Sequence, residues 1–324
     1  MAKQARKKKV VVLGGGTGNF TILNGLKKHP LDISVIVSMV DTGGSSGVLR
    51  DELGVLPPGD IRQCLVALSS SDEYMRELMS YRFTNGKLKG HNFGNLLLSA
   101  LEKSTGSFDK AIEATSEILR IRGRVIPATL DNVQLVAHLK SGKVVRGEHT
   151  IEYQNLDDLE KLVLDPVARA NPKAKLAIKS ADAVIIAPGD LYQSTIPNLL
   201  IKGITEEIRK SKAKKIYVCN LMTKKVHTDG YSVGDFTDKI EFYLGGKIDF
   251  VIYNNKKPDP KLVRRYAEKG ERPVSPGKNL PVKKFVGGDL LGKKFPKPIK
   301  NDPLRRNLIR HNSDKVAEMI VSLL

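Results

Sequence analysis

Cysteine, tryptophan and long apolar runs are scarce or absent in this 324-residue sequence, and each shortage excludes a class of protein. The two cysteines, Cys64 and Cys219, lie far apart without metal-ligand spacing, so we predict buried, reduced thiols and no zinc site. No apolar run approaches the roughly 18 residues that cross a bilayer, which argues against a membrane span. The basic start, Met1–Lys9, lacks the apolar stretch of a secretory signal. We therefore expect a reducing cytoplasm, and nothing in the sequence indicates haem or flavin.

Acidic residues are outnumbered: 54 Lys and Arg face 35 Asp and Glu, a formal net charge of +19. Such an excess favours anionic partners, phosphate-bearing ligands in particular. Nucleic acid is one such partner, but no aromatic-rich binding module and no basic recognition helix accompanies the charge. We expect a solvated, lysine-rich surface and no specific nucleic-acid partner, with nucleic-acid binding kept as an alternative. The basic residues fall in short runs at Lys7–Lys9, Lys212–Lys215, Lys256–Lys257 and Lys283–Lys284.

The order of apolar and glycine-rich segments predicts a Rossmann-like, doubly wound α/β fold with a mainly parallel sheet. A strand at Lys9–Leu13, a glycine turn, a helix at Thr21–Lys28 and a buried strand at Ile33–Val40 open the chain. The alternation resumes after the middle of the chain. There we expect strands at Ala183–Ala187, Lys215–Cys219 and Phe250–Tyr253, a helix from about Pro197 to Lys210, and a final helix pair within Asp302–Leu324.

The middle of the chain differs from its flanks because its apolar segments are short and separated by turn residues. We predict a small β-rich insertion at 121–179, carried by a nucleotide-binding core formed from 1–120 and 180–324. The expected short strands are Val125–Pro127, Val133–Leu139, Val144–Arg146 and Thr150–Tyr153.

The first glycine loop directly follows the first strand. Glycines there let the backbone approach a ligand closely, and the helix start behind them offers free N–H groups to an anion. The loop is neither a full dinucleotide fingerprint nor a Walker loop, so a tight turn that binds nothing is the alternative. Its candidate ligand-binding residues are Gly14, Gly15, Gly16, Thr17, Gly18 and Asn19.

A second glycine loop follows the second strand. Because the carboxyl ends of parallel strands line one crevice, we expect the two loops to converge there. Asp41 could hold a ribose hydroxyl or a divalent metal such as Mg²⁺, or it could simply cap the turn. Gly43, Gly44, Ser45 and Ser46 would contact phosphate.

Further candidates come from later loops. Asp60 either caps the helix Ile61–Ser69 or contacts ligand, and Arg62 would point out of the first turn of that helix. Arg310 could clamp a pyrophosphate or carboxylate, or be an ordinary surface arginine. The remaining candidates are His91, Asn95, Gly189, Asp190 and Asn220. No nucleophile is paired with a base and no metal cage is spaced in the sequence, so these loops argue for binding more than for chemistry.

Taken in order, the motifs resemble the gluconeogenesis-factor family, which is related to the CofD enzyme, 2-phospho-L-lactate transferase. The resemblance runs along nearly the whole chain. It rests on GGGTG at Gly14–Gly18, GGSSG at Gly43–Gly47, PPGDIRQCLVALS at Pro57–Ser69, GHNFGNLLL at Gly90–Leu98, VIPATLDNVQLVAHL at Val125–Leu139, IAPGDLYQSTIPNLL at Ile186–Leu200, CNLMT at Cys219–Thr223 and TDGYS at Thr228–Ser232.

The resemblance implies a Rossmann-like core with a nucleotide in the crevice at the strand ends. For the gluconeogenesis-factor branch it implies binding of a UDP-sugar, and support of cell shape and cell-wall metabolism during gluconeogenic growth. For the transferase branch it implies magnesium-dependent transfer of a phosphate-linked group from a nucleoside diphosphate donor, with Asp41 and Asp60 as the candidate catalytic residues. A homo-oligomer is compatible with either branch, and the sequence identifies no protein partner.

The sequence departs from the family pattern at four positions. Thr42 stands where a second aspartate is common beside Asp41, Val48 where arginine is common, His227 where glutamate is common, and Phe236 where histidine is common. Loss of the second acid weakens the case for a two-carboxylate metal site. We therefore expect a nucleotide-sugar-binding regulatory protein, with the transferase as the alternative.

Overall fold

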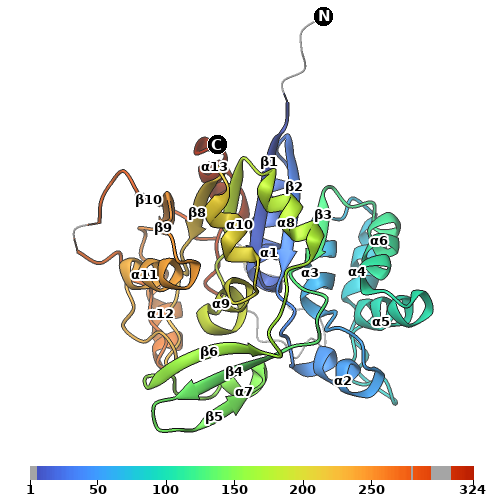
Figure 1. The fold of residues 1–324 in the computed structure, drawn as a ribbon. Helices are drawn as coiled ribbons and strands as arrows, with labels where there is room; N and C mark the ends of the chain where they lie inside the picture. Colours follow the sequence, from blue (N-terminus) through green and yellow to red (C-terminus); the bar gives the residue numbers. More distant parts are fainter. Residues whose placement is uncertain (1–5, 279, 293–307) are drawn as a thin grey trace, which may run out of the picture.

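The computed structural model in Figure 1 describes residues 6–278, 280–292 and 308–324. Its centre is a seven-stranded sheet in the order β10-β9-β8-β7-β1-β2-β3, in which every neighbouring pair is parallel. The strands are β1 (Lys8–Gly14), β2 (Leu31–Val37), β3 (Arg124–Pro127), β7 (Ala183–Ile186), β8 (Lys214–Val218), β9 (Phe250–Asn254) and β10 (Phe285–Gly288). The predicted fold class is confirmed.

The order of the strands creates a switch point beside β1. From β1 the chain first builds outward through β2 to β3, and later returns to the other side of β1 with β7, β8, β9 and β10. The connections that leave β1 and β7 at their carboxyl ends therefore run in opposite directions. In open α/β sheets such a point leaves a crevice in which ligands bind.

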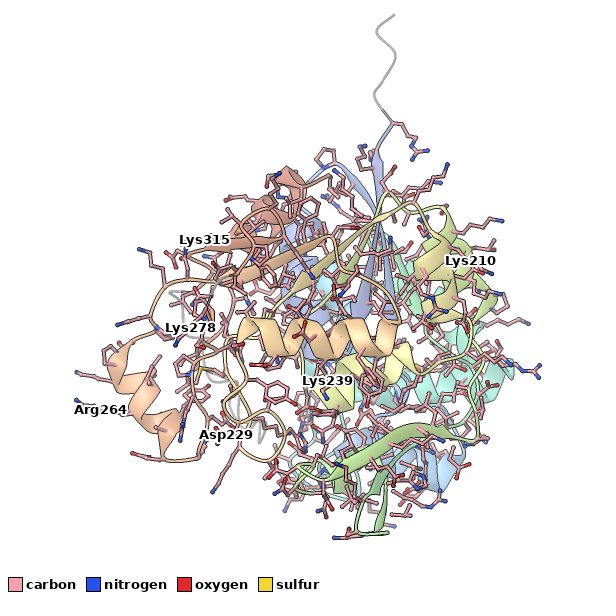
Figure 2. The ribbon with its side chains drawn as sticks, turned by 60° about the vertical axis from the view of Figure 1, so that its left-hand side comes forward. Lys210, Asp229, Lys239, Arg264, Lys278 and Lys315 are labelled. Atoms are coloured by element: carbon pink, nitrogen blue, oxygen red, sulfur yellow. The ribbon has the colours of Figure 1, made fainter. Side chains whose placement is uncertain are left out.

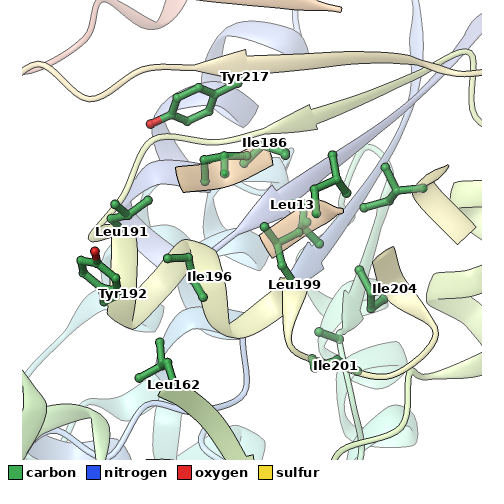
Figure 3. Packing of buried hydrophobic residues seen from close by; sticks show 14 of the residues in the cluster. Leu13, Leu162, Ile186, Leu191, Tyr192, Ile196, Leu199, Ile201, Ile204 and Tyr217 are labelled. Atoms are coloured by element: carbon green, nitrogen blue, oxygen red, sulfur yellow. The ribbon is translucent and has the colours of Figure 1, made fainter. Parts of the chain in front are cut away.

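Helices cover both faces of the sheet, as the unbroken apolar strands require. Along β1, Val10 and Val12 belong to one buried cluster while Val11 and Leu13 belong to the other, because successive side chains point to opposite faces. Figure 3 shows Leu13 and Ile186 from the sheet packed near Leu191 and Ile196. One cluster includes residues of α1 (Gly16–Leu26), α3 (Gly59–Leu68), α4 (Glu73–Ser80), α5 (Phe93–Thr105), α6 (Phe108–Ile118) and α13 (Ser313–Ser322); the other includes residues of α8 (Pro172–Lys179), α9 (Ile196–Leu199), α10 (Ile204–Lys210) and α11 (Val233–Leu244).

A small antiparallel sheet, β5-β4-β6, lies beyond the carboxyl ends of the large sheet (Figure 1). Its strands are β4 (Gln134–Leu139), β5 (Val144–Arg146) and β6 (Leu159–Asp165), and the short helix α7 (Glu148–Ile151) follows β5. Its apolar side chains, Leu135 and Leu162 among them, join the same buried cluster as α9 and α10. The small sheet is thus fixed to the core rather than tethered to it. The division into a 121–179 insertion and a core remains a prediction.

Three predictions of secondary structure need correction. The strand expected at Thr150–Tyr153 is not formed, because Thr150 and Ile151 belong to α7 and a turn follows. The segment Val125–Pro127 belongs to the large sheet, where β3 pairs with β2, and not to the small one. The helix expected from Pro197 to Lys210 is broken: a π-helical turn η1 (Leu191–Thr195) and α9 precede α10, which begins after Gly203. Gly203 adopts φ 105, a left-handed conformation that ends a regular helix.

Near the carboxyl terminus, the second helix of the expected pair is α13, and the first falls outside the described residues. The remaining helices are α2 (Gly44–Leu53) and α12 (Pro260–Ala267). Among the described residues, no helix has the length and apolar character needed to cross a membrane.

Candidate functional site

A cavity of about 520 Å³ opens at the carboxyl ends of β1, β7 and β8, beside the switch point. Its walls come from segments far apart in the sequence: the first glycine loop, the loop after β7, the loop after β8, α7, and the segment just before α13. The structure brings together nine of the predicted site residues in this lining, namely Gly15, Gly16, Thr17, Gly18, Asp60, Gly189, Asp190, Asn220 and Arg310.

The first glycine loop forms one wall, and its glycines are required by close packing. A Cβ on Gly18 would lie 1.7 Å from the carbonyl oxygen of Pro188, so the two loops cross there in contact. A Cβ on Gly16 would lie 2.4 Å from Oδ1 of Asp60. The N-cap residue of α1, Gly15, makes no side-chain cap, which leaves that end of the helix suited to an anion. Asn19 is fully buried behind Gly14 and does not line the cavity.

Asp60 faces the glycine loop from the start of α3. The capping interpretation is wrong: α3 begins at Gly59, its N-cap is Pro58, and no side chain caps it. The carboxylate instead accepts the backbone N–H of Gly16. Burial and the charge of Asp41 raise the pKa of Asp60 to about 7, although the Gly16 N–H and Arg62 oppose the shift.

An acidic wall of the cavity comes from the segment that connects β5 and β6 of the small sheet. Glu148 and Glu152 line the cavity from α7 and the residue that follows it. Burial, followed by the charges of Asp41, Asp60, Glu152 and Asp190, raises the pKa of Glu148 to about 8. The Glu148 carboxyl is therefore mostly protonated at neutral pH and can donate as well as accept a hydrogen bond.

Lys224 ties this acidic wall to the loop after β7. Its Nζ lies 3.0 Å from Oδ2 of Asp190, 3.1 Å from Oε1 of Gln193 and 3.3 Å from Oε1 of Glu152. Asp190 also caps η1 by accepting the N–H groups of Tyr192 and Gln193. Burial would raise the pKa of Asp190, but His227, whose Nδ1 lies 3.6 Å from Oδ2, and the charge of Lys224 outweigh it and hold this pKa below its ordinary value.

Asn220 and His311 brace the remaining side of the cavity. The Asn220 amide donates to the Gly189 carbonyl at 2.6 Å and accepts the Gly189 N–H at 3.3 Å, which fixes the loop after β7. His311 Nε2 lies 3.1 Å from the Cys219 carbonyl oxygen, and burial lowers the pKa of this imidazole to about 4. The ring is therefore neutral, and Arg310 beside it supplies the positive charge of this wall.

The other predicted residues form a separate buried cluster among α2, α3 and α5, and none of them lines the cavity. Ser45 lies 3.2 Å from His91 Nδ1 and accepts from the Asn95 amide at 3.3 Å, while Arg62 Nε donates to Asn95 Oδ1 at 2.9 Å. Arg62 is buried rather than pointing out of its helix. Gly43 is the N-cap of α2 and Gly44 its first residue, and the Ser46 hydroxyl accepts the Gly59 N–H. We call the following residues the polar cluster: Asp41, Ser45, Ser46, Arg62, His91 and Asn95.

Asp41 sits within the polar cluster and caps its own turn, since the Gly43 N–H donates to Oδ1 at 2.9 Å. Burial raises the pKa of Asp41, against the opposing effects of the Gly43 N–H, the Ser46 hydroxyl, Arg62 and His149. Asp41 and Asp60 are therefore neighbouring acids, but only Asp60 reaches the cavity.

The chain matches the family model described as 2-phospho-L-lactate transferase CofD over residues 10–285. A gluconeogenesis factor of Bacillus subtilis is 40% identical over 98% of this chain and 99% of its own length. A putative gluconeogenesis factor of Thermoanaerobacterium thermosulfurigenes is 43% identical, with 98% and 97% covered. The chain belongs to the gluconeogenesis-factor family and carries its CofD domain. A crystal structure of a UPF0052 family member from Bacillus halodurans superposes with a TM-score of 0.88 at 36% identity, covering 98% of this chain and 99% of that one.

A magnesium ion bound to this protein would need phosphate oxygens of a bound nucleotide in addition to protein side chains. The described residues contain no group of three or more His, Cys, Asp or Glu side chains arranged to hold a metal ion. Mg²⁺, however, often binds one or two carboxylates together with substrate phosphates. Asp60, at the glycine loop, fits that role, and the second acid, Asp41, stands behind it.

Sequence reasoning missed several lining residues, above all Glu148, Glu152, Gln193, Lys224 and His227. Glu148 and Glu152 lie in a short helical segment of the inserted sheet, where no periodicity or motif marks them. Lys224 directly follows the CNLMT motif at the end of a predicted strand. This position was the feature of the sequence that could have marked Lys224 as a site residue.

Proposed function

We propose that the protein is a nucleotide-sugar-binding regulator of the gluconeogenesis-factor type, with a UDP-sugar as its ligand. In this proposal it acts in the cytoplasm and supports cell shape and cell-wall metabolism during gluconeogenic growth. The volume of the cavity falls within the range of small-molecule sites, roughly 300–1,000 Å³.

The observation that carries the proposal is that one cavity is lined by two chemically different sets of groups. The first glycine loop offers backbone N–H groups and Arg310 offers a guanidinium, and both suit a pyrophosphate. Glu148, Glu152 and Asp190 offer oxygens that suit the hydroxyl groups of a sugar or ribose. A nucleotide-sugar carries both kinds of group in one molecule.

Magnesium fits the proposal as a partner of the phosphates. Asp60 would hold the ion at the glycine loop, and the ion would neutralise phosphate charge beside the acidic wall. Binding of a cation there would also favour the ionised form of Asp60, whose pKa is raised in the free protein.

Calorimetric titration tests the proposal. The purified protein is titrated with UDP-N-acetylglucosamine, UDP-glucose, GDP and NAD, each with and without Mg²⁺. We expect saturable binding of a UDP-sugar, and no turnover of it on prolonged incubation. Absence of binding by either UDP-sugar would contradict the proposed ligand class.

The alternative is a CofD-like transferase, favoured by one observation: two neighbouring buried acids, Asp41 and Asp60, have raised pKa values next to a phosphate-binding loop. In this case Asp60 would hold the magnesium ion and the loop would stabilise charge on the transferred group. Preference for GDP in the titration, with turnover of a diphosphate-linked donor that Asp60→Asn abolishes, would establish it. Lack of turnover with a panel of acceptors would count against it.

A further inference from the structure

Several lysines stand in segments that lie at the amino-terminal edge of the large sheet, whereas the cavity lies at the carboxyl ends of its strands. They come from the start of β1, the ends of α8 and α10, and the start of β8. We call the exposed residues Lys7, Lys8, Lys179, Lys210, Lys212 and Lys214 the basic face.

Hydrogen bonds show that the segments that carry these lysines are adjacent. Ser211, after α10, donates to the Ile178 carbonyl of α8 at 3.4 Å. The Lys214 N–H donates to the Asp182 carbonyl at 3.1 Å, and the Asp182 N–H donates to the Lys9 carbonyl at 2.8 Å. Four separate parts of the chain that carry lysines therefore meet at this edge.

The carboxylates in this region do not neutralise the basic face. Asp182 is engaged by Arg6 at 2.9 Å and by the Lys9 N–H at 2.7 Å, and Asp249 accepts the Lys215 N–H at 2.7 Å. Lys214 donates to the carbonyls of Leu323 and Leu324. Among the described residues, the side chains of Lys7, Lys179, Lys210 and Lys212 make no ion pair.

Helix-end electrostatics explain only part of this arrangement. Lysines at the ends of α8 and α10 complement the negative ends of those helices, which accounts for Lys179 and Lys210. Lys214 serves a third helix end, since its Nζ donates to the carbonyl of Leu323, the C-cap of α13, at 2.7 Å. Lys7, Lys8 and Lys212 lie outside any helix and, among the described residues, bond to no helix end. Three lysines thus remain as charge that the helix ends do not require.

We propose that the basic face docks the protein on an anionic lipid bilayer. Lysines close to a bilayer surface attract its anionic headgroups electrostatically, and the attraction grows with each added lysine. The face consists of lysines without exposed aromatic rings, so it offers neither the stacking platform of single-strand binders nor a recognition helix for a duplex groove. Docking by this edge would leave the cavity open on the far side of the molecule.

Vesicle co-sedimentation tests the proposal, with equal parts phosphatidylglycerol and phosphatidylcholine against phosphatidylcholine alone. We expect binding to the anionic vesicles only, and its loss as salt rises above physiological strength. The triple variant Lys179→Glu, Lys210→Glu, Lys212→Glu should bind more than tenfold more weakly.

The matched control changes the same charge elsewhere: Lys261→Glu, Lys269→Glu, Lys278→Glu. Figure 2 shows Lys278 and neighbouring Arg264 well away from Lys210. This control should keep at least half of the wild-type binding, and circular dichroism should show that all three proteins are fully folded at the temperature of the assay. Equal loss in both variants, no preference for anionic vesicles, or binding of a short DNA duplex in place of vesicles would overturn the proposal.

Discussion

The cavity wall and the polar cluster use the same residue types, yet the structure treats them differently. In the polar cluster, Ser45, Arg62 and Asn95 are hydrogen-bonded to one another and buried. In the cavity wall, no other residue hydrogen-bonds the Glu148 carboxyl within the described chain, and its pKa is raised to about 8. Polar groups that are satisfied internally stabilise a fold, whereas groups with unused hydrogen-bonding capacity are available to a ligand. Substitutions in the polar cluster should therefore mainly lower the free energy of unfolding, whereas substitutions in the cavity wall should mainly lower ligand affinity.

The largest effect is expected in the polar cluster. Arg62→Ala should lower the free energy of unfolding by about 3 kcal/mol, because it removes the hydrogen bond to Asn95 and a cation that stabilises the buried acid Asp41. Urea unfolding followed by circular dichroism measures it. A loss below about 1 kcal/mol would show that the cluster is not a structural unit.

Arg310→Ala should have the opposite signature. If Arg310 binds the distal phosphate, affinity for a UDP-sugar should fall by about 1.5–3 kcal/mol, and this loss should exceed the loss in free energy of unfolding. Calorimetry and urea unfolding on the same preparation test both parts. Unchanged affinity would remove Arg310 from the site.

Asp60→Asn should change how the free energy of unfolding depends on pH. The pKa of Asp60 is about 7 in the folded protein and near 4 when unfolded, so the folded state binds the extra proton between these values. Its contribution to stability is therefore present at low pH and is lost as pH rises toward 7. Relative to wild type, the variant should gain about 1–3 kcal/mol in unfolding free energy between pH 4 and pH 8. An identical difference at both pH values would argue against a raised pKa.

Glu148→Gln should give the smallest effect. At pH 7 the protonated carboxyl and the amide are close mimics, so ligand affinity should change by about threefold or less. Between pH 7 and pH 9 the wild type should lose affinity as Glu148 ionises and can no longer donate a hydrogen bond to the ligand, and the variant should not. Parallel pH profiles of the two proteins would place Glu148 away from the ligand.

The sequence predicted the sheet and one wall of the cavity, for identifiable reasons. Buried β-branched strands followed by glycine turns indicate parallel strands, and Gly14–Gly18 does lie at the carboxyl end of β1. The expected convergence of the Gly14–Gly18 and Gly43–Gly47 loops on one cavity depended on the order of the strands, which the sequence does not encode locally. Because β2 and β7 flank β1 on opposite sides, the cavity lies on the β7 side and the second loop builds the polar cluster.

The acidic wall of the cavity could not be predicted from the sequence, because its position depends on packing between segments far apart in the chain. Glu148 and Glu152 reach the cavity only because the small sheet packs into the same buried cluster as α9 and α10. Lys224 and Asp190 lie 34 positions apart, and their pairing at 3.0 Å follows from the adjacency of β7 and β8.

Hydrogen–deuterium exchange with and without UDP-N-acetylglucosamine tests the central claim most directly, because it reports on both regions in one experiment. We predict that the ligand slows exchange in residues 15–18, 148–152 and 189–193, and leaves residues 43–46 and 91–95 unchanged. Protection confined to residues 43–46 and 91–95 would contradict the account and place the ligand at the polar cluster.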